Sequence, residues 1–138
     1  MVKYKFISHT ADIKFQAFGN NLEECFINSF EALNKVIRDE KDIKKRAKRI
    51  INVKGNDLKE LLYNFLEEFL FLLDAKDFIA GEIKTIKIDA KNFQLSAVVF
   101  GDRASNYKIS NDVKAITYSD MFIKQKNGKF VVQIVLDV

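Results

Sequence analysis

Hydrophobic and polar residues alternate in the two segments that open the chain, residues 3–8 (KYKFIS) and residues 12–18 (DIKFQAF). Tyr4 and Phe6 fall on one face of the first segment, and Ile13, Phe15 and Ala17 fall on one face of the second. A period of two residues is typical of a strand with one face in the core and the other in water. The pattern therefore predicts two half-buried strands at the start of the chain.

Two longer segments carry apolar residues at helical spacing, and each begins with a capping signal. Asn21 is followed three residues later by Glu24, and Asp57 is followed by Glu60 in the same way. We therefore predict two amphipathic helices whose apolar faces lie on a sheet. The first apolar stripe consists of Leu22, Phe26, Leu33 and Ile37, flanked by Cys25, Ser29 and Val36, and the second consists of Leu58, Leu61, Leu62, Phe65, Leu66, Phe69, Leu72 and Leu73.

The remaining segments have the composition of strands. They are RIINVKG between the helices, then EIKTIKID, FQLSAVVFG, VKAITYSDMFIKQ and KFVVQIVLDV, and Asn127-Gly128 favours a tight hairpin between the last two. Because consecutive strands dominate, we predict an α+β fold, a two-layer sandwich whose mostly antiparallel sheet carries both long helices on one face. The chain length and the lack of a linker predict a single domain over residues 1–138.

Composition limits the binding partners and the cellular compartment that fit this sequence. The 23 basic and 19 acidic residues give a net charge of +4, which eases approach to RNA or to an acidic partner without identifying either. A single cysteine, Cys25, excludes an internal disulfide and fits a reducing, cytoplasmic setting. We expect no membrane association, because Glu67 and Glu68 interrupt the most apolar stretch and residues 1–7 lack the apolar region of a signal peptide.

Familiar catalytic motifs are absent from the sequence. It contains no glycine-rich phosphate loop, no Cys/His cluster of zinc spacing and no Gly-x-Ser-x-Gly elbow. These absences argue against nucleotide binding by a known loop and against zinc or serine-hydrolase chemistry. Cys25 lies beside an apolar stripe, so we expect it to be an inert core residue.

Carboxylates near the two ends of the chain are the strongest candidates for a site. Asp12 opens the second predicted strand, Asp137 is the penultimate residue, and Val138 carries the terminal carboxylate. If the two strands are neighbours, these groups can converge on one hard cation, Ca²⁺ or alternatively Mg²⁺ or Mn²⁺. Three protein ligands fall short of the 6–8 that Ca²⁺ takes, so we expect weak binding completed by water, phosphate or a partner. The alternatives are an Asp12 bonded to neighbouring amides and a solvated, frayed terminus.

Five segments together resemble the archease family of proteins that assist the tRNA-splicing RNA ligase. They are HTADI, the helix opening after FGN, DLKELLYNFLEEFLFLLD, VKAITYSDM and the terminal LDV, and they span the chain in the family's order. The sequence departs from the family in two places. Many relatives carry a histidine where this chain has Ser119, and relatives often have a tryptophan in the final hairpin, where Phe130 is the nearest aromatic residue.

The resemblance implies a non-catalytic activator that promotes guanylylation of the ligase from GTP and its multiple turnover. It also implies a metal site formed by Asp12, Asp137 and Val138, the residues already reached from their chemistry. The ligase is then the partner, and RNA is contacted indirectly through it. We expect His9 to hold the turn or to orient Asp12 rather than to bind metal, because the site is rich in oxygen. Lys114 starts a predicted strand and matches a family position, so we expect it to face the site or the partner.

Two other functions remain open from the residues. The basic run from Lys41 to Arg49 could bind RNA phosphates, although it lacks the interleaved aromatic residues of single-strand binders and such a run is commonly a solvated connector. The carboxylates could also serve a free-standing metal-dependent hydrolase, but no base or nucleophile is evident beside them.

Overall fold

The computed structural model describes residues 2–8, 11–40 and 42–138. The elements follow in the order β1 (Tyr4–Ile7), β2 (Ile13–Gly19), α1 (Leu22–Ile37), β3 (Ala47–Lys54), α2 (Leu58–Lys76), β4 (Phe78–Asp89), β5 (Gln94–Arg103), η1 (Ala104–Asn106), β6 (Ala115–Lys126) and β7 (Lys129–Asp137). All pairings between these strands are antiparallel. The α+β class, the antiparallel pairing and the two long helices are therefore confirmed.

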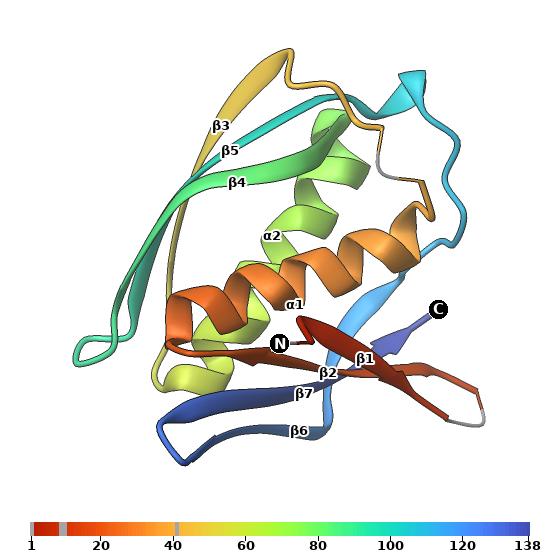
Figure 1. The fold of residues 1–138 in the computed structure, drawn as a ribbon. Helices are drawn as coiled ribbons and strands as arrows, with labels where there is room; N and C mark the ends of the chain where they lie inside the picture. Colours follow the sequence, from red (N-terminus) through yellow and green to blue (C-terminus); the bar gives the residue numbers. More distant parts are fainter. Residues whose placement is uncertain (1, 9–10, 41) are drawn as a thin grey trace.

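The strands form two sheets, where the sequence analysis expected one. Sheet A has the order β1-β2-β7-β6 and sheet B has the order β3-β5-β4. Both helices lie between the sheets, so that each sheet carries helices on one face only (Figure 1). The protein therefore has three layers, sheet A, helices and sheet B, instead of the two that were predicted. The reason is that β3, which lies between the two helices in sequence, pairs with β5 and so belongs to a second sheet.

The helices begin where the capping residues predict. The side chain of Asn21 accepts a hydrogen bond from the Glu24 amide at 2.8 Å, and Asp57 does the same for Glu60 at 2.8 Å. Each glutamate in turn accepts from a main-chain amide just before the cap, at 3.3 Å for Glu24 and 3.0 Å for Glu60. These reciprocal bonds satisfy amides that a helix leaves unpaired at its start.

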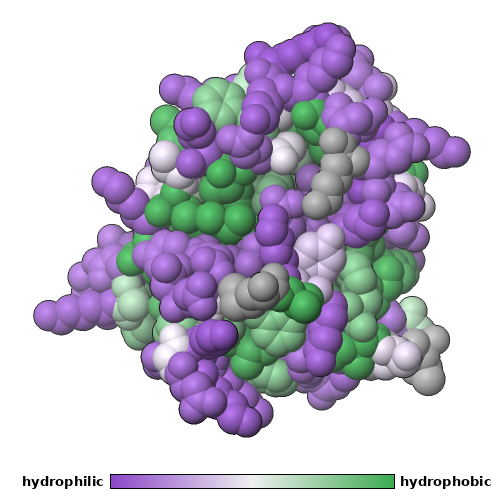
Figure 2. All heavy atoms as spheres, in the orientation of Figure 1, coloured by the Kyte–Doolittle hydropathy of each residue, from purple (hydrophilic) through white to green (hydrophobic). Residues whose placement is uncertain are grey.

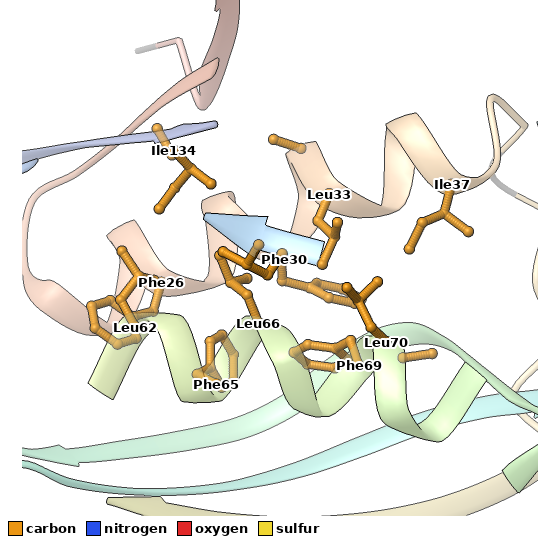
Figure 3. Packing of buried hydrophobic residues seen from close by; sticks show 14 of the residues in the cluster. Phe26, Phe30, Leu33, Ile37, Leu62, Phe65, Leu66, Phe69, Leu70 and Ile134 are labelled. Atoms are coloured by element: carbon orange, nitrogen blue, oxygen red, sulfur yellow. The ribbon is translucent and has the colours of Figure 1, made fainter. Parts of the chain in front are cut away.

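The two helices meet through the apolar stripes that the sequence predicts. Phe30 of α1 lies 4.6 Å from Phe69 of α2 between ring centroids, and Phe26 lies 5.8 Å from Phe65 (Figure 3). Inward-facing residues of both sheets, such as Phe15, Ile51 and Ile134, complete this core. Hydrophilic residues cover most of the face shown in Figure 2, with hydrophobic patches between them. No helix in the described part of the chain is long and apolar enough to cross a membrane.

Candidate functional site

The beginning of β2 and the end of β7 lie together at one end of sheet A. Ile13, the first residue of β2, pairs with Leu136 of β7. Asp12 directly precedes Ile13 and Asp137 directly follows Leu136, so this pairing brings both acidic residues to the same sheet end. Asp12 and Asp137 are each half-buried. The strand adjacency that the proposed cation site requires is thus present.

Lys114 and Val138 lie at the same end. Lys114 precedes β6, and its main-chain amide donates a hydrogen bond to the carbonyl oxygen of Asp137 at 2.8 Å. The next residue, Ala115, pairs with Asp137 in the sheet, and the Lys114 side chain is exposed. Val138 is half-buried and packs against the core. His9, the remaining predicted residue, lies outside the described part of the chain.

The segment that leads to Lys114 is tied to the end of α1. Arg38 donates to the carbonyl oxygen of Lys108 at 2.7 Å, and the Ser110 amide donates to the carbonyl oxygen of Ile37 at 2.7 Å. The side chain of Asn111 donates to the Val36 carbonyl oxygen at 2.9 Å. These bonds hold the approach to β6 in place. A hollow of about 380 Å³ lies beside this junction and is lined by Phe6, Ile7, Asp12, Ile13, Lys14, Lys35, Val36, Asp39 and Asn111.

Strand β6 contains an irregularity close to this end that was not predicted from the sequence. Thr117 pairs with Val135 and Phe122 with Gln133, so β6 holds three more residues than β7 over this interval. Asp120 in the insertion has a φ of 55°, and its carboxylate lies 3.2 Å from the Lys14 ammonium. The only sequence signal was TYSD, a polar interruption of the alternation in that strand.

The inserted segment also carries an exposed aromatic residue. The Tyr118 ring stacks on Tyr63 of α2 with centroids 4.3 Å apart and planes 8° from parallel, yet Tyr118 remains 49% exposed. Burial, together with the charge of Glu60, raises the pKa of Tyr118 above its usual value. The stack connects sheet A to α2 on the side where β6 forms the sheet edge.

The donor chemistry at this sheet end suits a hard cation. Two aspartates and a terminal carboxylate supply only oxygen atoms, which Ca²⁺, Mg²⁺ and Mn²⁺ prefer. Within the described residues, no group of three or more His, Cys, Asp or Glu side chains is placed to hold a metal ion. The proposed set contains only two such side chains, Asp12 and Asp137, and it would need the main-chain carboxylate of Val138 as a third protein ligand. The residues fit a weakly held, partly hydrated ion.

The basic run from Lys41 to Arg49 is only partly a connector, because its last three residues belong to β3. Lys41 itself lies outside the described residues. Lys45 forms an ion pair with Glu82, and Arg46 lies 3.9 Å from Asp102. The Arg49 guanidinium lies 4.8 Å from the centroid of the Phe78 ring. Several of these positive charges therefore already have partners within the protein.

Comparison with known proteins decides the family. The profile of the Archease protein family (MTH1598/TM1083) matches residues 4–138. The chain belongs to the archease family. It is 36% identical over 143 residues to the archease of Pyrococcus furiosus and 31% identical over 140 residues to that of Sulfurisphaera tokodaii, and each comparison covers both chains completely.

Solved archease structures share the fold. The solution structure of protein 1598 from Methanobacterium thermoautotrophicum matches with a TM-score of 0.82 and 29% identity, covering 99% of each chain. The crystal structure of a Thermotoga maritima archease, described as a possible chaperone, matches with a TM-score of 0.63 and 18% identity. That comparison covers 97% of this chain and 96% of the other, and it concerns the fold alone.

Proposed function

We propose that this archease is a non-catalytic accessory protein that activates the tRNA-splicing RNA ligase. In this proposal it promotes GTP-dependent guanylylation of the ligase and its repeated turnover in the cytoplasm, and this activating role reaches RNA indirectly, through the ligase. Family membership supports an accessory role. The observation that carries the proposal is the pairing of β2 with β7, which brings Asp12 and Asp137 to one sheet end.

The chain's own residues have separate roles in this proposal. Asp12, Asp137 and the carboxylate of Val138 would hold a divalent cation, for which Ca²⁺ is our first choice and Mg²⁺ or Mn²⁺ the alternatives. Such an ion, when bound, supplies positive charge that can neutralise phosphate oxygens of a nucleotide. The Lys114 amide donates a hydrogen bond to the Asp137 main chain and its side chain is exposed, so in this proposal Lys114 would face the partner. Because the protein provides few ligands, the ion keeps positions that a partner can fill.

The test measures formation of the ligase–GMP adduct with a cognate ligase, GTP and divalent metal. Wild-type protein should raise both adduct formation and multiple-turnover joining, and Asp137→Ala should abolish both effects while thermal unfolding stays cooperative. Asp74→Ala is the matched control, because Asp74 is an exposed aspartate on α2. It should stimulate as the wild type does.

Normal stimulation by Asp137→Ala would refute the carboxylate mechanism. Product release by the protein without any ligase would instead support the hydrolase alternative. Direct binding is measured by titrating Ca²⁺ into wild-type and Asp12→Ala proteins and following the unfolding temperature, since an ion that binds only the folded state raises it. The substituted protein should lose the metal-dependent increase.

A further inference from the structure

The outer face of sheet A, on the side away from the helices, carries lysines and aromatic residues from all four strands. Lys5, Gln16, Gln133 and Phe122 form one row across the sheet through successive strand pairs. The next row contains Phe18, Val131 and Lys124, and the last contains Lys129 and Lys126. We call these residues the lysine–phenylalanine face. Their neighbours in sequence, such as Ala17, Val132 and Ile134, point inward and are fully buried.

Two of the lysines lie directly over aromatic rings of this face. The Lys5 ammonium is 5.9 Å from the centroid of Phe18, and the Lys124 ammonium is 4.4 Å from that of Phe122. Both rings are half-buried, whereas Lys5, Lys124, Lys126 and Lys129 are exposed. A cation therefore lies beside each of the two aromatic rings on this face. This combination of cations and rings is the one that the Lys41 to Arg49 run lacks.

The positive charge of the face is not balanced locally. Among the described residues, none of its four lysines has a carboxylate within ion-pair distance, and its three rows contain no Asp or Glu. The nearest ion pair in the direction of Asp12 and Asp137 joins Lys14 to Asp120. Four unpaired ammonium groups on one sheet face attract a polyanion, which relieves their mutual repulsion.

A hollow of about 450 Å³ lies at the hairpin end of this face. Phe18, Phe130 and Val131 form part of its wall, and Lys126 and Lys129 stand at its rim. Val2, which also lines it, is 63% exposed. The hollow thus offers apolar surface beside positive charge, the combination that a nucleic-acid base attached to a phosphate requires.

We propose that the lysine–phenylalanine face binds single-stranded nucleic acid, with phosphates on the lysines and bases on the rings of Phe18 and Phe122. Aromatic platforms between cations are typical of single-strand binding, because every base has a flat face and every linkage a charge. An anionic membrane fits less well, since membrane-binding surfaces insert projecting apolar side chains and both phenylalanines are half-buried in the sheet. This site is separate from the proposed cation site and does not depend on the proposed function.

The test is a fluorescence anisotropy titration of the full chain with labelled oligouridylate and with the deoxy oligomer of the same length, between about 50 and 200 mM salt. Binding should weaken with salt at a slope of about −0.7 per phosphate contact. The triple variant Lys124→Gln, Lys126→Gln and Lys129→Gln should lower the size of that slope by about 2. Phe122→Leu should weaken binding by a factor of about 5 or more, because it removes a stacking surface.

The control removes the same charge from a different exposed sheet face. The triple variant with Lys48→Gln, Lys54→Gln and Lys87→Gln neutralises three exposed lysines of sheet B. Because it changes only the overall positive potential of the protein, its affinity for the oligomers should stay within about twofold of wild type. Equal weakening by the two triple variants, or no binding of either oligomer, would overturn the proposal. Preferential capture by anionic phosphatidylserine vesicles that the oligomers do not displace would also overturn it. Circular dichroism and thermal unfolding establish that each variant is folded.

Discussion

Replacing Arg38 tests whether the segment before β6 is held by one buried guanidinium. Arg38 is only 8% exposed. It donates to the carbonyl oxygen of Lys108 at 2.7 Å and to the Asp42 carboxylate at 2.6 and 3.0 Å, and it lies 5.1 Å from the Tyr107 ring centroid. The side chain thereby joins the end of α1 to Asp42, four residues later, and to the distant segment that contains Tyr107 and Lys108. Arg38→Ala should loosen both connections.

The expected cost follows from these contacts. A hydrogen bond from a charged donor to a carbonyl contributes roughly 1.5–3 kcal/mol. The pair with Asp42 contributes about 1 kcal/mol or less, because the Asp42 side chain is 60% exposed. The contact with the Tyr107 ring adds about 0.5–1 kcal/mol. We therefore expect Arg38→Ala to lower the free energy of unfolding by about 3 kcal/mol.

Urea unfolding followed by circular dichroism measures this change from the shift in midpoint at constant slope. Arg38→Lys should recover only part of the loss, because an ammonium cannot donate to Asp42 and Lys108 with the fork geometry of a guanidinium. Arg103→Ala is the matched control, since Arg103 is 71% exposed and 3.8 Å from Asp77, and it should cost less than about 0.5 kcal/mol. Hydrogen exchange at the Ser110 amide should also accelerate in Arg38→Ala. A loss below about 1 kcal/mol, or an equal loss in the Arg103 control, would refute the reasoning.

Three further predictions concern other parts of the molecule. Burial raises the pKa of the Cys25 thiol to about 12, so Ellman's reagent at mildly alkaline pH should label it only after unfolding, and prompt native labelling would contradict this. Gly101→Ala should destabilise by at least about 2 kcal/mol in urea unfolding, because the added methyl overlaps the Ile79 carbonyl oxygen; a neutral result would show that β4 can shift. The hydrogen bond from Tyr107 keeps the pKa of Asp102 below its usual value. The stabilisation from this hydrogen bond is therefore present at neutral pH and is lost as Asp102 becomes protonated below about pH 4. Tyr107→Phe should be less stable at neutral pH and less sensitive to acid, as unfolding midpoints across this range will show.

Much of the fold could be predicted because local signals agree with the final packing. The helix starts follow from Asn21 and Asp57, whose side chains form the expected caps. The strands follow from alternation that matches one buried and one exposed face. What could not be predicted was the division into two sheets, because it depends on β3 pairing with β5 and no local residue pattern encodes that long-range choice.

The candidate site shows the same division between local and long-range information. The carboxylates near both ends of the chain could be recognised in the sequence. Their proximity could not, because it depends on the pairing of Ile13 with Leu136. The insertion at Asp120 was missed because a strand with three additional residues resembles an ordinary strand in sequence.

The lysine–phenylalanine face was missed for another reason. Its residues come from four separate strands, so no single segment shows the whole set of cations and rings.

The position of β7 between β2 and β6 also sets the order in which the protein can assemble. On the ribosome, β1 and β2 emerge early, but they have no inner neighbour until the final strand has been synthesised. Sheet B and both helices are available before that moment. The end of sheet A that holds Asp12 and Asp137 is therefore among the last parts of the newly made protein to form. A chain that loses β7 to truncation loses this end together with an inner strand of the sheet.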